Sequence, residues 1–216
     1  MKHLSVTKVA AKNVAAENVP DIMNTAGIDY NLVECVDWKH DFPYKPKMSF
    51  AIAYTDDEIL IHYCVEEKCI RAVAPHDNGN VWEDSCCEFF VQPIADGSYY
   101  NFECNCVGTL LIGFGHAREN RQLAPDNILR RVTRWSSMGR KPFDNKDGNF
   151  KWQMSLVIPF TSFFMHDVKT LNGQKVMANF YKCGDKTSTP HFISWNKIDV
   201  LSPDFHRPEF FGELDF

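Results

Sequence analysis

A succession of short apolar runs, separated by turn residues, constrains the fold more than any other feature of the sequence. The segment KMSFAIAYTDDEILIHYCVEE holds two β-rich runs around the turn at 55–58, and this pattern predicts a hairpin. The segment SCCEFFVQPIADGSYYNFECNCVG holds a second pair of runs, joined through 93–98 with an Asp-Gly turn dipeptide. Many strand-length runs with regular turn signals predict an all-β sandwich or barrel.

Five later runs also have the length of a strand, and they lie at 109–116, 128–137, 150–160, 175–184 and 190–198. Helical periodicity is limited to two short stretches, 19–27 and 159–166. We therefore expect an antiparallel, jelly-roll-like β-sandwich with a few short helical turns. No repeat, low-complexity tract or linker interrupts the sequence, so residues 1–216 are predicted to form a single domain.

The charge and hydropathy of the chain argue against two classes of partner. The formal net charge of −5 disfavours a nucleic-acid backbone, and no apolar run approaches the roughly 20 residues of a membrane span. The N-terminal stretch MKHLSVTKVAAKNVAAENV lacks the apolar core of a signal peptide. As written, the sequence predicts a cytoplasmic protein, although a chain whose leader had been removed would look the same.

The segment VWEDSCCEFFVQP, residues 81–93, concentrates chemically active groups: a tryptophan, three carboxylates and two adjacent thiols. It is compatible with a catalytic acid pair, a metal or redox site, a ligand platform, or one strand of a sheet. If 86–92 is extended, side chains alternate between faces, so Cys87, Phe89 and Val91 share an apolar face. Glu88 lies on the opposite face, and by the same parity Trp82 points that way too.

The expected return strand, 99–105, divides in the same way. Phe102 and the cysteine at 104 share one face, and the cysteine at 106, just beyond the strand, has the same parity, whereas Asn101, Glu103 and Asn105 share the other. A register fixed by burial places Glu88 and Glu103 on the same polar face of neighbouring strands. On the apolar face, cysteine acts as a small hydrophobic residue.

The eight cysteines follow no metal or redox motif, because no C-x-x-C spacing occurs. Cys86 and Cys87 are adjacent, and adjacent residues on a strand point to opposite faces, so these two do not easily form a disulfide together. Reduced, mostly buried thiols are the expected state.

The polar face carries more hydrogen-bonding groups than a solvated sheet surface requires. Carboxylates and amides form paired hydrogen bonds with vicinal hydroxyls, and an indole stacks on the apolar face of a sugar ring. The simpler alternative is an exposed polar face with one half-buried tryptophan.

Several segments resemble the family 9 carbohydrate-binding modules. They are W-E-D-S-x-x-E-F-F-V-x-P, D-G-x-Y-Y-x-F-E-x-N-x-x-G-T, F-K-W-x-x-x-L-V-I-P-F, F-I-S-W-N and P-E-F-F-G-E-L-x-F, in family order from about Phe50 onward. The resemblance implies a β-sandwich that clamps a terminal sugar between two tryptophans. It also implies a link to xylan-degrading enzymes and polysaccharide breakdown, and it allows a structural calcium ion.

The resemblance assigns roles to individual positions. Trp82 matches the first clamp tryptophan, Glu88 the acidic residue on the next strand, and Trp195 the second clamp, with Asn196 beside it. The family's basic sugar-binding residue has no counterpart on the 99–105 strand, which contains no arginine. The candidate binding residues for a mono- or oligosaccharide are Trp82, Glu88, Asn101, Glu103, Trp195 and Asn196, and no catalytic residue is assigned.

Two other functions remain open at this stage. A glycoside hydrolase could use Glu88 and Glu103, since carboxyls about 5 Å apart suit a retaining mechanism and about 6.5–9.5 Å an inverting one. A domain that kept the fold but lost the sugar site could instead serve as an interaction module.

No cofactor is predicted apart from the structural calcium ion that the resemblance allows, and the oxygen-rich stretches that suggest calcium are DDE at 56–58, which lies in a predicted turn, and DNKDG at 144–148. The DNKDG stretch lacks the remainder of an EF-hand loop, so we interpret it as a turn before the 150–160 strand.

Overall fold

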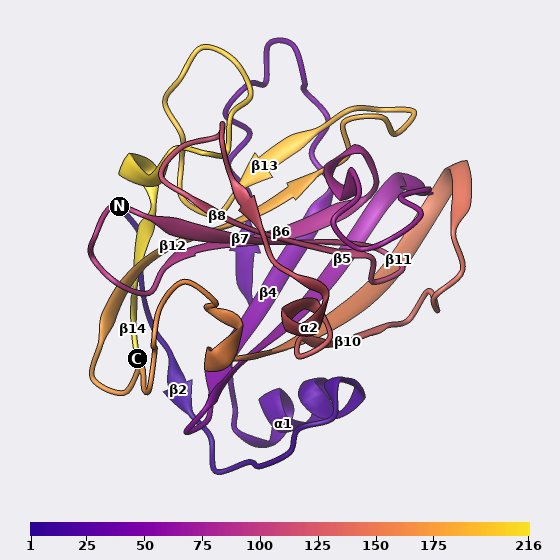
Figure 1. Cartoon of the computed structure of the whole chain (residues 1–216). Helices are drawn as coiled ribbons and strands as arrows, with labels where there is room; N and C mark the ends of the chain where they lie inside the picture. Colours follow the sequence, from indigo (N-terminus) through magenta and orange to yellow (C-terminus); the bar gives the residue numbers. More distant parts are fainter.

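Two β-sheets packed face to face make up the structure, a computed structural model that describes all 216 residues (Figure 1). In the view shown, β6 and β7 of the first sheet run nearly horizontally, and β4, β5 and β11 of the second run diagonally across them. This arrangement is the predicted β-sandwich. The two termini lie near each other because β1 pairs with β14.

The first sheet has eight strands, which in spatial order are β1 (His3–Ser5), β14 (Gly212–Asp215), β12 (Lys175–Cys183), β6 (Cys86–Gln92), β7 (Tyr99–Asn105), β8 (Leu110–Gly115) and β9 (Gln122–Leu123), with β13 (Phe192–Ser194) beside β12. The second has six, which are β10 (Thr133–Ser136), β11 (Phe143–Pro159), β5 (Glu58–Ala72), β4 (Lys47–Tyr54) and β2 (Thr7–Lys8), with β3 (Asn31–Val33) beside β4.

The helical segments are short: α1 (Val19–Thr25), α2 (Asp126–Leu129), and the 3-10 turns η1 (Ala16–Asn18), η2 (Val81–Glu83), η3 (Phe160–Ser162) and η4 (Pro208–Phe210). None of them has both the length and the apolar character that a membrane-crossing helix needs.

Most expected strands are present, and the differences have local causes. The 128–137 run begins as the end of α2 and becomes extended only at β10. The DNKDG stretch is not a separate turn, because β11 starts at Phe143 and passes through two register irregularities against β5. The 159–166 stretch forms one 3-10 turn, η3. Two pairings, β1 with β14 and β2 with β4, are parallel, so both sheets are mixed.

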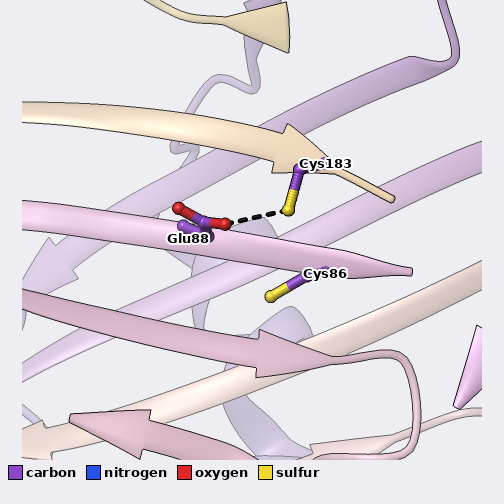
Figure 2. Close-up of side chains that lie close together, drawn as sticks. All are labelled: Cys86, Glu88 and Cys183. Carbon is purple, nitrogen blue, oxygen red and sulfur yellow. Dashed lines mark hydrogen bonds between the residues drawn. The ribbon is translucent and has the colours of Figure 1, made fainter. Parts of the chain in front are cut away.

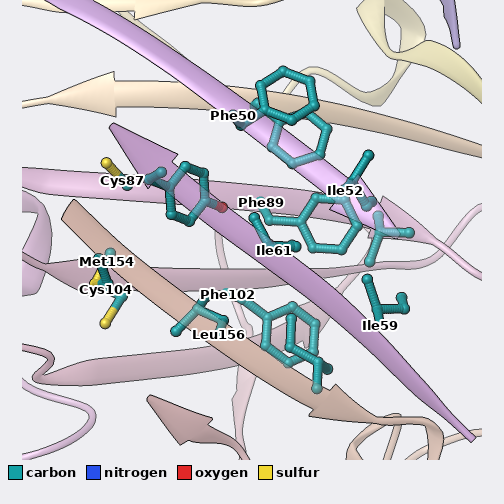
Figure 3. Close-up of a cluster of buried hydrophobic side chains, with 14 of the residues drawn as sticks. Phe50, Ile52, Ile59, Ile61, Cys87, Phe89, Phe102, Cys104, Met154 and Leu156 are labelled. Carbon is teal, nitrogen blue, oxygen red and sulfur yellow. The ribbon is translucent and has the colours of Figure 1, made fainter. Parts of the chain in front are cut away.

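The space between the sheets is filled by one large apolar cluster, part of which Figure 3 shows. The predicted inward row of β6 is confirmed, because Cys87, Phe89 and Val91 all lie in this cluster. Cys104 on β7 and Cys106 just beyond it are buried in the same cluster. All eight cysteines are free thiols, and those facing this cluster are packing residues.

The outer faces of both sheets are covered as well. On the second sheet, Val19 and Met23 of α1 pack with Ala51, Ala53 and Leu60 of β4 and β5. On the first sheet, the long loops around Trp38 and Phe205 pack over Cys86, Phe90 and Tyr181. Because the second sheet covers one face of β6 and β7 and the loops cover the other, both strands are almost entirely buried. Glu88 therefore lies within a covered face, not on an open surface.

The turn before β6 is anchored by Asp84, whose side chain is fully buried. Its carboxylate accepts hydrogen bonds from the Arg71 guanidinium at 2.9 Å, from the backbone N–H groups of Val73 and Ala74, and from the Asn105 amide. These four bonds tie η2 to strands β5 and β7. Asp84 is thus a structural residue that fixes where the neighbouring Trp82 lies.

We predict that Asp84→Ala lowers the free energy of unfolding by about 3–5 kcal/mol, because it leaves a buried charge and two backbone donors without partners. Denaturant unfolding measures this loss. The matched control is Asp56→Ala, which removes an exposed partner of Lys8 and should cost less than about 1 kcal/mol. Equal losses in the two variants would contradict the anchoring role.

Candidate functional site

A cavity of about 430 Å³ opens on the outer face of the first sheet. Its floor is formed by side chains of β6, β7 and β8, and its walls come from η2, the segment after β8, and the loop before η4. Four of the six predicted binding residues line it, namely Trp82, Glu88, Asn101 and Glu103. The cavity is thus the place where the polar face of the sheet meets its covering loops.

Glu88 and Glu103 form the centre of the floor. They are directly opposed in the β6–β7 register, as predicted, and both are buried. Glu88 Oε1 accepts a hydrogen bond from the Cys183 thiol at 2.9 Å. Glu103 Oε1 accepts one from the Asn101 amide at 2.8 Å, whereas its Oε2 is buried without any partner. The floor therefore presents carboxyl oxygen atoms that are free to bind a ligand.

Asn101 is held in place by a guanidinium. Arg121 donates from both Nε and Nη2 to Asn101 Oδ1, at 2.9 and 2.6 Å, and lies 4.2 Å from the centre of the Tyr99 ring. Gly113, the register partner of Asn101, makes room for it, because a Cβ there would lie 2.5 Å from Asn101 Oδ1. The arginine thus orients the amide that bonds Glu103.

Burial changes the protonation of the floor. It raises the pKa of Glu88 well above the usual value, and the nearby Glu103 charge raises it further. Burial also raises the pKa of Glu103 to about 7, against opposing effects of Asn101 and Arg121. Burial likewise raises the pKa of Asp185 to about 6. The raised pKa favours the protonated form of Glu88, which can both donate and accept hydrogen bonds.

Trp82 lies at the rim of the cavity and is 36% exposed, the most accessible of the large aromatic side chains. It sits in η2 between buried Val81 and the Asp84 anchor. Its carbonyl accepts hydrogen bonds from the Cys183 thiol at 3.3 Å and the Asp185 N–H at 3.3 Å. The backbone of Trp82 is fixed, and its ring is available for contact.

Trp195 and Asn196 do not belong to this cavity, so their predicted place in the binding site needs correction. Trp195 is 3% exposed and packs edge-on against Phe50 and Phe180 in the core between the sheets. Asn196 uses its side chain to bond the backbone of Lys2 and Phe210. The F-I-S-W-N segment therefore stabilises the fold at the β12–β13 edge. The aromatic residues that do line the cavity with Trp82 are Phe192 and Phe205.

Several lining residues were not predicted, among them Arg118, Arg121, Asp185, Phe192, Asp204, Phe205 and His206. The arginines follow β8 in the segment HARENRQ, and they supply the positive charge that the β7 strand lacks. The sequence did contain a signal for these residues, because two arginines in a short segment directly after a strand can reach ligands bound at the end of that strand. Phe205 and His206 come from a loop whose return over the sheet no local pattern predicts.

Neither Asp84 nor the DNKDG stretch gathers carboxylates into a calcium site. Asp144 and Asp147 are exposed along β11, and the Asp84 oxygens are fully used by protein donors. The only cluster of three metal-ligating side chains is Cys86, Glu88 and Cys183 (Figure 2). Two of its ligands are sulfur, and calcium prefers oxygen.

A model of the carbohydrate-binding family 9 matches residues 17–216. The chain belongs to this family. No curated protein sequence gives a significant match.

Solved structures agree with this assignment. One is a protein of Bacteroides uniformis, provisionally described as carbohydrate-binding, with 50% sequence identity and a TM-score of 0.97 over 100% of this chain and 99% of its own. A family 9 carbohydrate-binding module of Caldicellulosiruptor kristjanssonii is known with glucose and with cellotriose. These two structures share 14% identity with this chain, cover 99% of it and 95% and 93% of their own chains, and have TM-scores of 0.59 and 0.58. At this identity they show the shared fold.

We predict that stability falls as pH rises from about 5 to 8, in part because of Glu103. Its pKa is raised in the folded protein from 4.5 to about 7, so the folded state binds the proton more tightly than the unfolded chain. Its favourable contribution is complete below pH 4.5 and is lost as the pH passes through 7.

Glu103→Gln should remove that loss and make the variant more stable than the parent at pH 8 by about 1–3 kcal/mol. The measurement is denaturant unfolding across this pH range. Glu66→Gln, at an exposed carboxylate whose pKa is lowered, is the control and should leave the slope between pH 5 and 8 unchanged. An unaltered slope in Glu103→Gln would argue against a protonated floor.

Proposed function

We propose that the chain binds a mono- or oligosaccharide, without catalysis, in the cavity above Glu88 and Glu103. One observation carries the proposal: Glu103 lines a cavity of about 430 Å³, and its buried Oε2 makes no hydrogen bond. An unpaired buried carboxyl oxygen is costly, and a ligand hydroxyl would satisfy it. The cavity volume lies in the range of small-molecule sites.

The chemistry of the lining supports a neutral polyhydroxylated ligand. Glu88 and Glu103 supply paired oxygens for vicinal hydroxyls, and the Trp82 ring offers an apolar surface for the axial hydrogens of a pyranose. Phe192 and Phe205 add apolar surface on the same cavity. Membership of a carbohydrate-binding family, with members known in complex with glucose and cellotriose, supports the same ligand class.

The geometry of the carboxyls argues for binding over hydrolysis. Glycosidases place two carboxyls on either side of the scissile bond. Directly opposed residues on neighbouring strands point to the same side of the sheet, so Glu88 and Glu103 reach a ligand from one direction. The proposal extends to a role in polysaccharide breakdown, because the modules that the chain resembles are attached to xylan-degrading enzymes.

A glycoside hydrolase that uses Glu88 and Glu103 is the second candidate. The observation in its favour is that burial raises the pKa of both opposed carboxyls, as a general acid requires. The two candidates differ in one measurable respect, which is turnover of a bound oligosaccharide.

We predict that cellotriose binds and that Trp82→Ala weakens binding about tenfold, which corresponds to about 1.4 kcal/mol. The loss follows from removal of the stacking surface at the rim. Isothermal titration calorimetry measures it. Trp135→Ala is the matched control, because Trp135 lies on β10 of the other sheet and should bind cellotriose as the parent does. Equal affinity of Trp82→Ala and the parent for cellotriose would show that the sugar does not stack on Trp82.

We further predict that prolonged incubation leaves cellotriose intact, as measured by chromatography of the sugar. Glu103→Gln should weaken binding, because an amide NH₂ replaces a carboxyl oxygen that accepts a hydrogen bond from a sugar hydroxyl. Release of glucose that disappears in both Glu88→Gln and Glu103→Gln would establish the hydrolase instead. If no sugar on an oligosaccharide array binds the folded protein, the interaction-module alternative is favoured.

A further inference from the structure

The side chains of Cys86, Glu88 and Cys183 converge at one point beneath the cavity (Figure 2). Their sulfur and carboxyl oxygen atoms all lie within 4.8 Å of one another, and Cys183 Sγ is 2.9 Å from Glu88 Oε1. Ligands of a tetrahedral zinc ion lie about 3.5–3.8 Å apart. Small side-chain rotations would therefore bring the three atoms to ligand positions.

We propose that Cys86, Glu88 and Cys183 bind a thiophilic divalent cation of the zinc type. Two thiolates and one carboxylate form a donor set that suits zinc and its close relatives, whereas calcium and magnesium prefer oxygen ligands alone. This site is separate from the sulfur-containing rows of the core, because Cys86 and Cys183 point to the outer face of the sheet.

The backbone already holds the ligands in place. Cys86 and Cys183 are register partners on β6 and β12, and Glu88 lies two residues along β6 on the same face. Central strands with both neighbours paired are rigid supports, so little ordering entropy is lost on binding. Outside the cluster the three side chains make few contacts: the Cys183 thiol also donates to the Trp82 carbonyl at 3.3 Å, and Cys86 makes only a long contact of 3.7 Å with the Cys87 carbonyl.

The site has an entry path and an open position. Glu88 and Cys183 line the cavity, so an ion can enter from solvent, and a water molecule can complete the coordination from that side. Binding as two thiolates and a carboxylate would leave a net charge of −1. Arg118 lines the same cavity and would offset it. The thiol and carboxyl protons leave to solvent as the metal binds.

Titration of the fully reduced protein with Zn²⁺, by calorimetry in the absence of any sugar, tests the proposal. We expect one ion per chain, with affinity reduced at least tenfold in Cys86→Ser and in Cys183→Ser. Cys64→Ser is the matched control, because Cys64 is a free thiol on β5 of the other sheet and should bind as the parent does. Ca²⁺ should not compete.

Co²⁺ provides a second readout that does not depend on affinity. Thiolate ligation gives intense near-ultraviolet charge-transfer absorption, which should appear in the parent and in Cys64→Ser, and fall in each site variant that circular dichroism shows to be folded. The proposal is overturned if the reduced parent binds no Zn²⁺, if Cys64→Ser loses binding equally, or if Cys86 and Cys183 join in a disulfide that persists under reductant. None of these outcomes decides whether the cavity binds a sugar, which the cellotriose experiments test separately.

Discussion

The antiparallel pairing of β6 with β7 sets both the packing between the sheets and the floor of the cavity. It sends Phe89 and Phe102 into the core between the sheets and holds Glu88 opposite Glu103 on the other face. The inner row is stabilised by burial of large apolar side chains. Because the same backbone carries both rows, the core packing that fixes the register also fixes the spacing of the two carboxyls.

That covered outer face gives the site its chemistry. Were the face open to solvent, Glu88 and Glu103 would be ordinary ionised surface residues. Phe192, at the start of β13, and the loop that carries Phe205 cover it, and the resulting burial raises the pKa of both carboxyls. The same burial places the Cys183 thiol against Glu88. Ligand recognition and the thiol–carboxyl cluster thus share one cause.

The sequence predicts those parts of the structure that depend on local periodicity. Alternation along the strand is sufficient to place Cys87 in the core and Glu88 opposite Glu103, because the side-chain period is two. It cannot place Trp195, whose burial depends on contacts with β4 and β12, or Arg121, which reaches Asn101 from a loop 20 residues away in sequence. A tryptophan that matches a family motif therefore predicts where the residue lies in the fold more reliably than it predicts a role in binding.

The central claim is that a sugar binds at the outer face of β6 and β7 against the Trp82 ring. The most direct test follows the indole N–H signals of the five tryptophans by NMR during titration with cellotriose. We expect the Trp82 signal to shift until the site is saturated, whereas the signals of Trp152 and Trp195, both buried in the core, stay in place. A shift at Trp195 without one at Trp82 would show that the sugar does not bind against the Trp82 ring.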